Sequence, residues 1–218
     1  MPQPSAVDAF ARRALKPVAW VGCLLPLVWT VFDGATGGLG ADPIREVTHR
    51  TGFTALTLLM VTLAVTPARR LTGWNPLIQV RRLLGLFAFF YAVVHFLIYL
   101  FDQGFDPGYI VEDVVNHPYV TVGFTALLLL IPLAVTSTQA SIRRLGKRWV
   151  KLHRLIYLIA GLGVVHFYWL VKRDVREPLI FAAVFALLMA TRLPFFAASR
   201  KQRRSPSAVR GASQPAES

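Results

Sequence analysis

Long apolar stretches alternate with short polar ones along the whole chain. Each apolar stretch approaches the roughly 20 residues that a helix needs to cross a bilayer, and none shows the strict alternation of a half-buried strand. The pattern predicts an all-α fold, an integral membrane bundle of six helices. The expected spans are residues 17–32, 52–66, 82–101, 119–136, 151–171 and 178–196.

Prolines mark several expected helix boundaries. The second span is expected to end at Pro67, just before Arg69 and Arg70, because proline cannot continue the backbone hydrogen bonding. Pro132 is expected to kink the fourth span, and Pro178 suits the first turn of the sixth. The chain is thus divided into an N-terminal segment (1–16), a six-helix transmembrane domain (17–196) and a basic tail (197–218). The tail is rich in Ser, Ala and Pro and is expected to be disordered.

Composition agrees with a membrane protein. Of the 218 residues, 55% are hydrophobic, which is high for an ordinary soluble domain. The net charge of +13 could suggest a nucleic-acid partner, but the basic residues fall between the spans. We therefore expect no nucleic acid, and we assign the basic residues to topology in a lipid membrane. Cys23 is the single cysteine, so no intrachain disulfide can form.

The basic residues are distributed unequally between the two sides. Counting segments alternately, nineteen of the 24 Lys and Arg residues fall on one side, together with both termini. The other side holds nine of the eleven Asp and Glu residues. Because Lys and Arg collect on the cytoplasmic side of membrane proteins, both termini are predicted to be cytoplasmic.

Three histidines lie within the apolar stretches, where ionisable side chains are costly and usually functional. Helical rise and orientation place His95 and His166 at similar depth toward the outer face, and His153 near the inner face. Two facing imidazoles suit the central iron of a b-type haem, and two axial ligands would restrict it to electron transfer. Such a haem would be bound non-covalently, since no Cys-x-x-Cys-His motif is present. The alternative is two unrelated core histidines bonded to backbone carbonyls.

An inner site is predicted around His153. A spacing of thirteen residues does not put His153 and His166 on one helix face, so they either address different sites or the helix is distorted near Gly161 and Gly163. These glycines could admit a large ligand or another helix. Arg81 lies fourteen residues before His95, on nearly the same face, which Leu84, Ala88 and Tyr91 continue. Arg81 could hold a haem propionate or approach the iron, or it could simply mark the membrane interface.

Other motifs are assigned no chemistry. His49 and His117 are expected in outer loops rather than as ligands, and the glycine-rich residues 37–40 lack the lysine of a phosphate loop. No dinucleotide fingerprint is present, and about twenty residues follow the last span. Electrons are therefore expected from a quinone, a bound flavin or a separate reductase. No catalytic residue is assigned.

Residues 81–85, 91–95, 149–157 and 166–167 resemble the MsrQ (YedZ) family. These are haem-binding membrane subunits of the bacterial periplasmic methionine-sulfoxide reductase system, in the ferric-reductase-like transmembrane superfamily shared with NADPH oxidases. The resemblance covers about residues 10–197. In the oxidases the third helix carries two haem histidines, whereas here only His95 matches and Arg81 stands at the inner position.

That resemblance implies one or two b-type haems, an associated flavin mononucleotide (FMN) and a place in the bacterial inner membrane. It also implies that electrons pass from the quinone pool or a cytosolic flavin reductase to the periplasmic molybdenum-containing subunit MsrP. The chain would be an electron-transfer subunit rather than the catalytic one.

Two other functions remain open on sequence alone: a ferric or quinone reductase without that partner, and a non-redox transporter or scaffold. In the redox interpretation, Asp102, Asp106, Glu112 and Asp113 form an acidic outer loop that could steer a basic partner.

Overall fold

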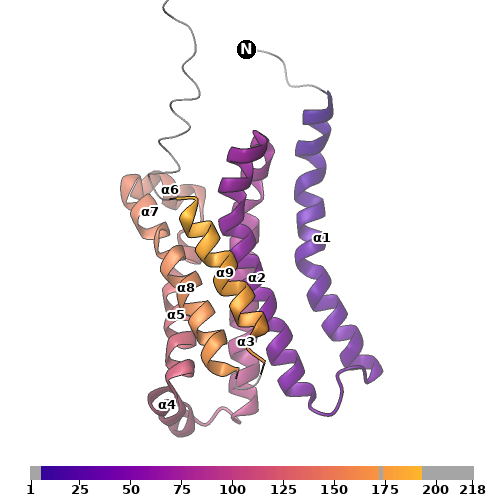
Figure 1. Cartoon of the computed structure of the whole chain (residues 1–218), viewed down its shortest axis with the longest axis vertical. Helices are drawn as coiled ribbons and strands as arrows, with labels where there is room; N and C mark the ends of the chain where they lie inside the picture. The colour runs from indigo at the N-terminus through magenta and orange to yellow at the C-terminus, as the bar shows by residue number, and fades with distance from the viewer. Residues whose placement is uncertain (1–5, 172–173, 193–218) are drawn as a thin grey trace, which may run out of the picture.

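The computed structural model describes residues 6–171 and 174–192, with side chains from residue 13 onward. All regular elements in this part of the chain are helices (Figure 1). They are α1 (Ala6–Thr36), α2 (Pro43–Thr72), the 3₁₀ helix η1 (Asn75–Gln79), α3 (Arg81–Asp102), α4 (Pro107–Asn116), α5 (Pro118–Val135), α6 (Gln139–Leu145), α7 (Lys147–His153), α8 (Leu155–Leu170) and α9 (Arg176–Ala190).

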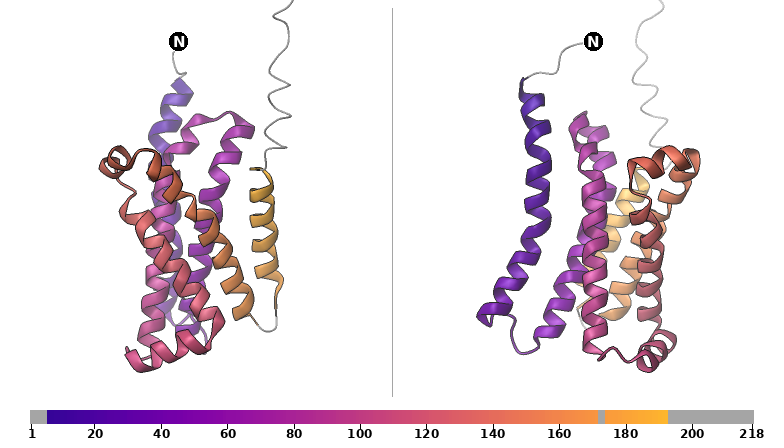
Figure 2. Two further views of the ribbon diagram at one scale, coloured as in Figure 1. Left: turned by 90° about the vertical axis from the view of Figure 1, so that its left-hand side faces the viewer. Right: turned by 180° about the vertical axis from the view of Figure 1, so that it is seen from behind.

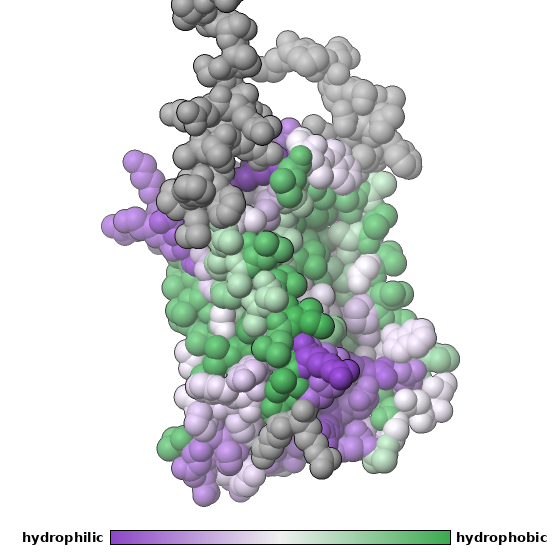
Figure 3. All heavy atoms as spheres, viewed as in Figure 1, coloured by the Kyte–Doolittle hydropathy of each residue, from purple (hydrophilic) through white to green (hydrophobic). Residues whose placement is uncertain are grey.

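The long helices run up and down through one bundle (Figures 1 and 2). The α1–α2 connection, α4 and the α8–α9 connection lie at one end, and η1, α6 and α7 lie at the other. This is the grouping that the charge count predicts for the two sides of a membrane. Apolar residues cover the middle of the face seen in Figure 3, and hydrophilic residues lie toward both ends.

Five helical stretches in the described chain are long and apolar enough to cross a membrane: Arg13–Thr36, Pro43–Thr72, Asn75–Asp102, Pro118–Val135 and Lys147–Leu170. The sixth expected span corresponds to α9, which has 15 residues in the described part and falls short of that length. Pro178 lies in its first turn, as predicted. Residues 193–196 of the expected span and the tail 197–218 lie outside the described residues.

Helix α2 continues through Pro67 to Thr72, so the prediction that it ends at Pro67 is wrong. Proline lacks the N–H that would bond to the Leu63 carbonyl four residues earlier. The Arg192 guanidinium replaces that donor, with Nη2 at 2.8 Å from the Leu63 oxygen. It also lies over the Tyr157 ring, 4.9 Å from its centre. A residue near the end of α9 thus satisfies the interrupted helix.

The fifth expected span is not one continuous helix. A turn at Arg154 separates α7 from α8. Trp149 anchors α7 to the end of α5 by donating its indole N–H to the Thr136 carbonyl at 2.9 Å. His153 and His166 therefore belong to separate helices, and their thirteen-residue spacing needs no helix distortion near Gly161 and Gly163.

Helix α1 stands apart from the other helices along much of its length (Figure 1). Tyr91, on the α3 face expected to carry Arg81 and His95, joins the two helices and is only 1% exposed. Its hydroxyl accepts from the Leu27 N–H at 3.1 Å and donates to the Cys23 carbonyl at 2.7 Å. In a regular helix those two groups would bond to each other, and Pro26 beside them disturbs that pairing. The Tyr91 hydroxyl thus bonds to both of these backbone groups of α1.

Candidate haem site

His95 on α3 and His166 on α8 meet inside the bundle. Their ring centres are 6.2 Å apart and the ring planes cross at 84°. Two nitrogen–metal bonds of about 2 Å, with about 1 Å from each nitrogen to its ring centre, give a separation of roughly 6 Å. No cluster of three or more His, Cys, Asp or Glu side chains suited to a metal ion occurs in the described residues. A two-histidine donor set fits an iron whose remaining ligands come from a macrocycle.

Both rings are held by the same kind of hydrogen bond. His95 Nδ1–H donates to the Thr48 carbonyl of α2 at 2.9 Å, and His166 Nδ1–H donates to the Tyr119 carbonyl of α5 at 2.7 Å. Because a carbonyl oxygen only accepts, each neutral ring must carry its hydrogen on Nδ1. Nε2 keeps its lone pair, and the bond at Nδ1 fixes the ring orientation, as is usual for metal-binding histidines.

Two glycines provide the space for these rings. A Cβ at Gly52 of α2 would lie 2.9 Å from His95 Cε1, and one at Gly123 of α5 would lie 2.6 Å from His166 Nδ1. Both distances are too short for any side chain without movement of the imidazole. Each glycine lies four residues after the carbonyl that holds its histidine, so one helix turn provides both the acceptor and the gap.

The sequence contains a repeat that predicts this arrangement but that our reading of the sequence missed. Gly-Phe-Thr-Ala-Leu occurs at 52–56 and 123–127, and Val-Val-His-Phe occurs at 93–96 and 164–167. In both motifs the second copy follows the first after the same number of residues. They correspond to the helix pairs α2–α3 and α5–α8, which make the most extensive contacts in the bundle. Gly52 and Gly123 could have been identified from this repeat, whereas Thr48 and Tyr119 lie outside it.

His153 lies at the opposite end of the bundle from the acidic loop. Its ring stacks on Trp149 with centres 3.8 Å apart, and its Nδ1 lies 3.2 Å from the Trp149 carbonyl oxygen. Its Nε2 is buried without a hydrogen-bond partner in the described structure. Arg81 begins α3 at this same end of the bundle. A buried ring nitrogen without a hydrogen-bond partner could serve as a ligand.

Gly161 and Gly163 both lie against other helices. A Cβ at Gly161 would contact Phe185 of α9 at 3.5 Å, and one at Gly163 would approach Leu56 of α2 at 3.1 Å. Among the other histidines, His49 lies inside α2, so its expected position in a loop is wrong. His117 precedes α5, as expected of a connecting residue, and its Nδ1 lies 2.7 Å from Asp113.

The acidic outer loop is partly helical. Asp106 accepts the Gly108 N–H at 2.8 Å and caps α4. Asp113 is only 9% exposed and accepts a hydrogen bond of 2.6 Å from Tyr99. The expectation that all four acids form an exposed rim is therefore wrong, since Asp113 joins α3 to α4. Asp102, Asp106 and Glu112 are exposed.

Comparison with known proteins identifies the class. Residues 51–164, which include the Gly52, His95 and Gly123 positions, match the model of the ferric reductase like transmembrane component. Together with the five apolar helices, this match defines a multi-pass membrane protein of the ferric-reductase-like class. No solved structure matches the chain.

Three curated relatives narrow the class. A protein from Xanthomonas campestris pv. campestris (strain 8004) is 50% identical over 191 residues, 87% of this chain and 86% of its own. One from Rhodospirillum rubrum is 52% identical over 197 residues (89% and 95%), and one from Ralstonia nicotianae is 48% identical over 194 residues (87% and 89%). Each is named protein-methionine-sulfoxide reductase heme-binding subunit MsrQ. The chain belongs to the MsrQ family.

Proposed function

We propose that this chain is a b-type haem electron-transfer subunit that delivers electrons to a periplasmic methionine-sulfoxide reductase, MsrP, for the repair of oxidised proteins. The observation that carries the proposal is the His95–His166 pair, with rings 6.2 Å apart and both Nδ1 atoms occupied by backbone carbonyls. The names of the relatives support the haem and the reductase system.

In this proposal His95 and His166 would hold the haem iron through their Nε2 atoms. The bound haem supplies a one-electron ferric–ferrous couple. A haem held by two histidines would keep no ligand position for a substrate, which would favour electron transfer over oxygen or sulfoxide chemistry at this site. The Thr48 and Tyr119 carbonyls keep the rings oriented, and Gly52 and Gly123 leave them room. These groups would limit ligand movement between the two oxidation states.

A second, inner haem is proposed at His153, with Arg81 as a partner for a propionate or for the iron. The buried Nε2 of His153 without a hydrogen bond supports this site. We further propose that α9 spans the inner membrane as a sixth helix and that both termini are cytoplasmic, as the Lys and Arg distribution favours. The outer haem then lies on the periplasmic side, near the proposed partner.

The electron donor is proposed to be the quinone pool or a flavin reductase. The FMN association implied by the family resemblance stays a prediction, and we assign no residue to it.

The test is the haem content of purified, folded variants by the pyridine haemochrome assay. His95→Ala and His166→Ala are each expected to lose the outer haem, because one axial ligand disappears. His153→Ala should lower the haem-to-protein ratio by one haem if the inner site exists. His117→Ala is the control and should retain all haem.

Full haem in either His95→Ala or His166→Ala would exclude the pair as ligands. A wild-type ratio of one haem that His153→Ala leaves unchanged would exclude the inner site alone.

A further inference from the structure

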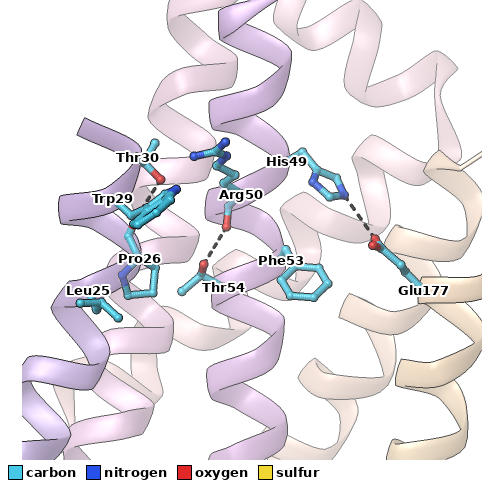
Figure 4. A pocket seen from close by; sticks show the side chains of 9 residues that line it. All are labelled: Leu25, Pro26, Trp29, Thr30, His49, Arg50, Phe53, Thr54 and Glu177. Carbon is cyan, nitrogen blue, oxygen red and sulfur yellow. Dashed lines mark hydrogen bonds and ion pairs between the residues drawn. The ribbon is translucent and has the colours of Figure 1, made fainter. Parts of the chain in front are cut away.

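A groove with a volume of about 420 Å³ lies between α1, α2 and α9 (Figure 4). Small-molecule sites typically span about 300–1,000 Å³, so a ring-sized ligand fits. Trp29 comes from α1, Phe53 from α2 and Glu177 from the first turn of α9. On α1 the groove begins at Leu25 and Pro26, in the turn that Tyr91 contacts, and extends to Thr30.

The groove opens toward lipid. Leu25 and Trp29 line it and are 61% and 62% exposed on a helix that can cross the membrane. In a bilayer such exposed apolar side chains face hydrocarbon chains rather than water. A ligand dissolved in the membrane could therefore enter without crossing an aqueous phase.

One side of the groove carries hydrogen-bonding and proton-exchanging groups. His49 Nε2 lies 3.6 Å from Glu177 Oε2 (Figure 4), and both side chains are about half exposed. Arg50 bonds to Glu46 through Nε at 2.7 Å and to Asp33 through Nη1 at 2.5 Å. Among the described residues, Arg50 Nη2 donates no hydrogen bond, so its two N–H groups remain available to a ligand oxygen.

The groove adjoins the His95–His166 pair. His49 directly follows Thr48, whose carbonyl holds His95, and Phe53 directly follows Gly52, against which the His95 ring lies. The His49 ring is also 6.0 Å from that of Phe167, the residue after His166. A single helix, α2, thus separates the groove from the proposed iron site.

From these features we propose that the groove binds a membrane hydroquinone and is the place where it is oxidised. The inference rests on the proposed function, since it needs the iron between His95 and His166 as electron acceptor. An aromatic ring with polar oxygens and an apolar tail matches a groove with an apolar mouth, aromatic walls and a polar side.

The reaction balances with the groups present. Oxidation breaks the two O–H bonds of the hydroquinone and yields a quinone, two protons and two electrons. Each proton passes to His49, where Glu177 stabilises the imidazolium, and then to water at the outer end. The two electrons would leave one at a time to the one-electron acceptor that the proposed function supplies, the haem that His95 and His166 would hold, and from there to the periplasmic partner.

A second groove provides an internal comparison. It has a volume of about 450 Å³, lies between α8 and α9, and is lined by Tyr157, apolar residues and Gly161. It has no His, Glu, Asp, Lys or Arg in its lining. Because its volume is similar and its lining has no ionisable His, Glu or Asp, it is a suitable control site.

The experiment uses the full haem-loaded chain in lipid nanodiscs. Haem reduction by decyl-benzohydroquinone is followed by stopped-flow absorbance. Dithionite, which does not have to bind in the groove, is the control reductant. Thr54→Trp fills the groove, and Glu177→Gln removes its carboxylate. Their matched controls are Ala182→Trp in the α8–α9 groove and Asp174→Asn on the same outer side.

We expect Thr54→Trp and Glu177→Gln to slow reduction by the hydroquinone roughly tenfold or more, with dithionite reduction and both controls unchanged. In a measurement without turnover, an azido-decyl-benzoquinone should photolabel α1 and α2 residues of the groove in the oxidised protein. Excess decyl-benzoquinone and Thr54→Trp should each suppress that labelling.

Unchanged hydroquinone rates in both groove variants, or labelling confined to the α8–α9 groove, would overturn the inference. So would a wild-type haem that dithionite reduces and the hydroquinone does not. A wild-type chain without haem would instead overturn the proposed function, while the photolabelling would still test the groove.

Discussion

At the scale of single residues, the site depends on two positions without a side chain as much as on the two histidines. Gly52 and Gly123 occupy ordinary helical positions, so their role is not backbone freedom but the absence of a Cβ. The imidazoles of His95 and His166 fill the space where those carbons would be. A histidine in a packed helix bundle needs such a gap, because close-packed interiors leave no spare volume for a ring.

We predict that Gly52→Ala and Gly123→Ala each lose most of the outer haem. The new methyl group would displace a ring that the Thr48 or Tyr119 carbonyl holds in place. The measurement is Soret absorbance per folded protein. Gly22→Ala, where nothing lies within 4 Å, and Gly85→Ala, 3.8 Å from Thr62, are the controls. Normal haem content in both site variants would show that the rings tolerate the displacement.

At the scale of elements, proline leaves backbone groups of two helices without their usual hydrogen-bond partner. Side chains from other helices bond to those groups. Arg192 of the α9 end bonds to the carbonyl left free by Pro67 in α2, and Tyr91 of α3 enters the backbone of α1 beside Pro26. Within a membrane, water cannot satisfy such groups, so a neighbouring helix must do so.

Tyr91→Phe is predicted to destabilise the protein by about 1–3 kcal/mol, since the Leu27 N–H and the Cys23 carbonyl both lose their partner. The thermal midpoint in detergent should fall, and alkylation of the buried Cys23 should accelerate as α1 loosens. Tyr168→Phe removes a hydroxyl from a ring that is 46% exposed and serves as the control. Equal midpoints for the two variants would contradict the role of Tyr91.

At the scale of the whole molecule, the two ends of the bundle differ in charge. One end carries α4 and the exposed acids Asp102, Asp106 and Glu112. The other end carries His153 and the basic helices α6 and α7. The acidic end is therefore the one that could attract a basic partner.

We predict that the exposed acids steer the periplasmic partner. The variant Asp102→Asn, Asp106→Asn, Glu112→Gln should slow haem reoxidation by the partner roughly three- to tenfold at low salt, because charge complementarity raises association rates. The difference should vanish near 1 M salt, where the Debye length is about 3 Å. Asparagine at 106 keeps the α4 cap.

Asp42→Asn is the matched control, since Asp42 caps α2 at the same end without belonging to the acidic group. A rate that does not respond to the triple change at any salt concentration would place the docking surface elsewhere. Asp113 is left intact because its bond to Tyr99 is structural.

The sequence by itself determined the helical class, the positions of the long helices and the grouping of their connections at two ends. These follow from local physics: the length of apolar runs and the placement of Lys and Arg. It also indicated that His95, His153 and His166 lie in helices of the bundle, but it missed His49, which lies in α2. Had the repeat at residues 52–56 and 123–127 been used, it would have indicated the glycines as well.

Only the tertiary structure decided what depends on contacts between distant segments. The passage of α2 through Pro67 depends on Arg192, and the burial of Asp113 depends on Tyr99. The ring separation of His95 and His166 and the carbonyls that hold them depend on four helices at once. Periodicity along one chain reports which face of a helix is apolar, but not which partner atom will meet it. That partner is chosen by packing, which is a property of the assembled bundle.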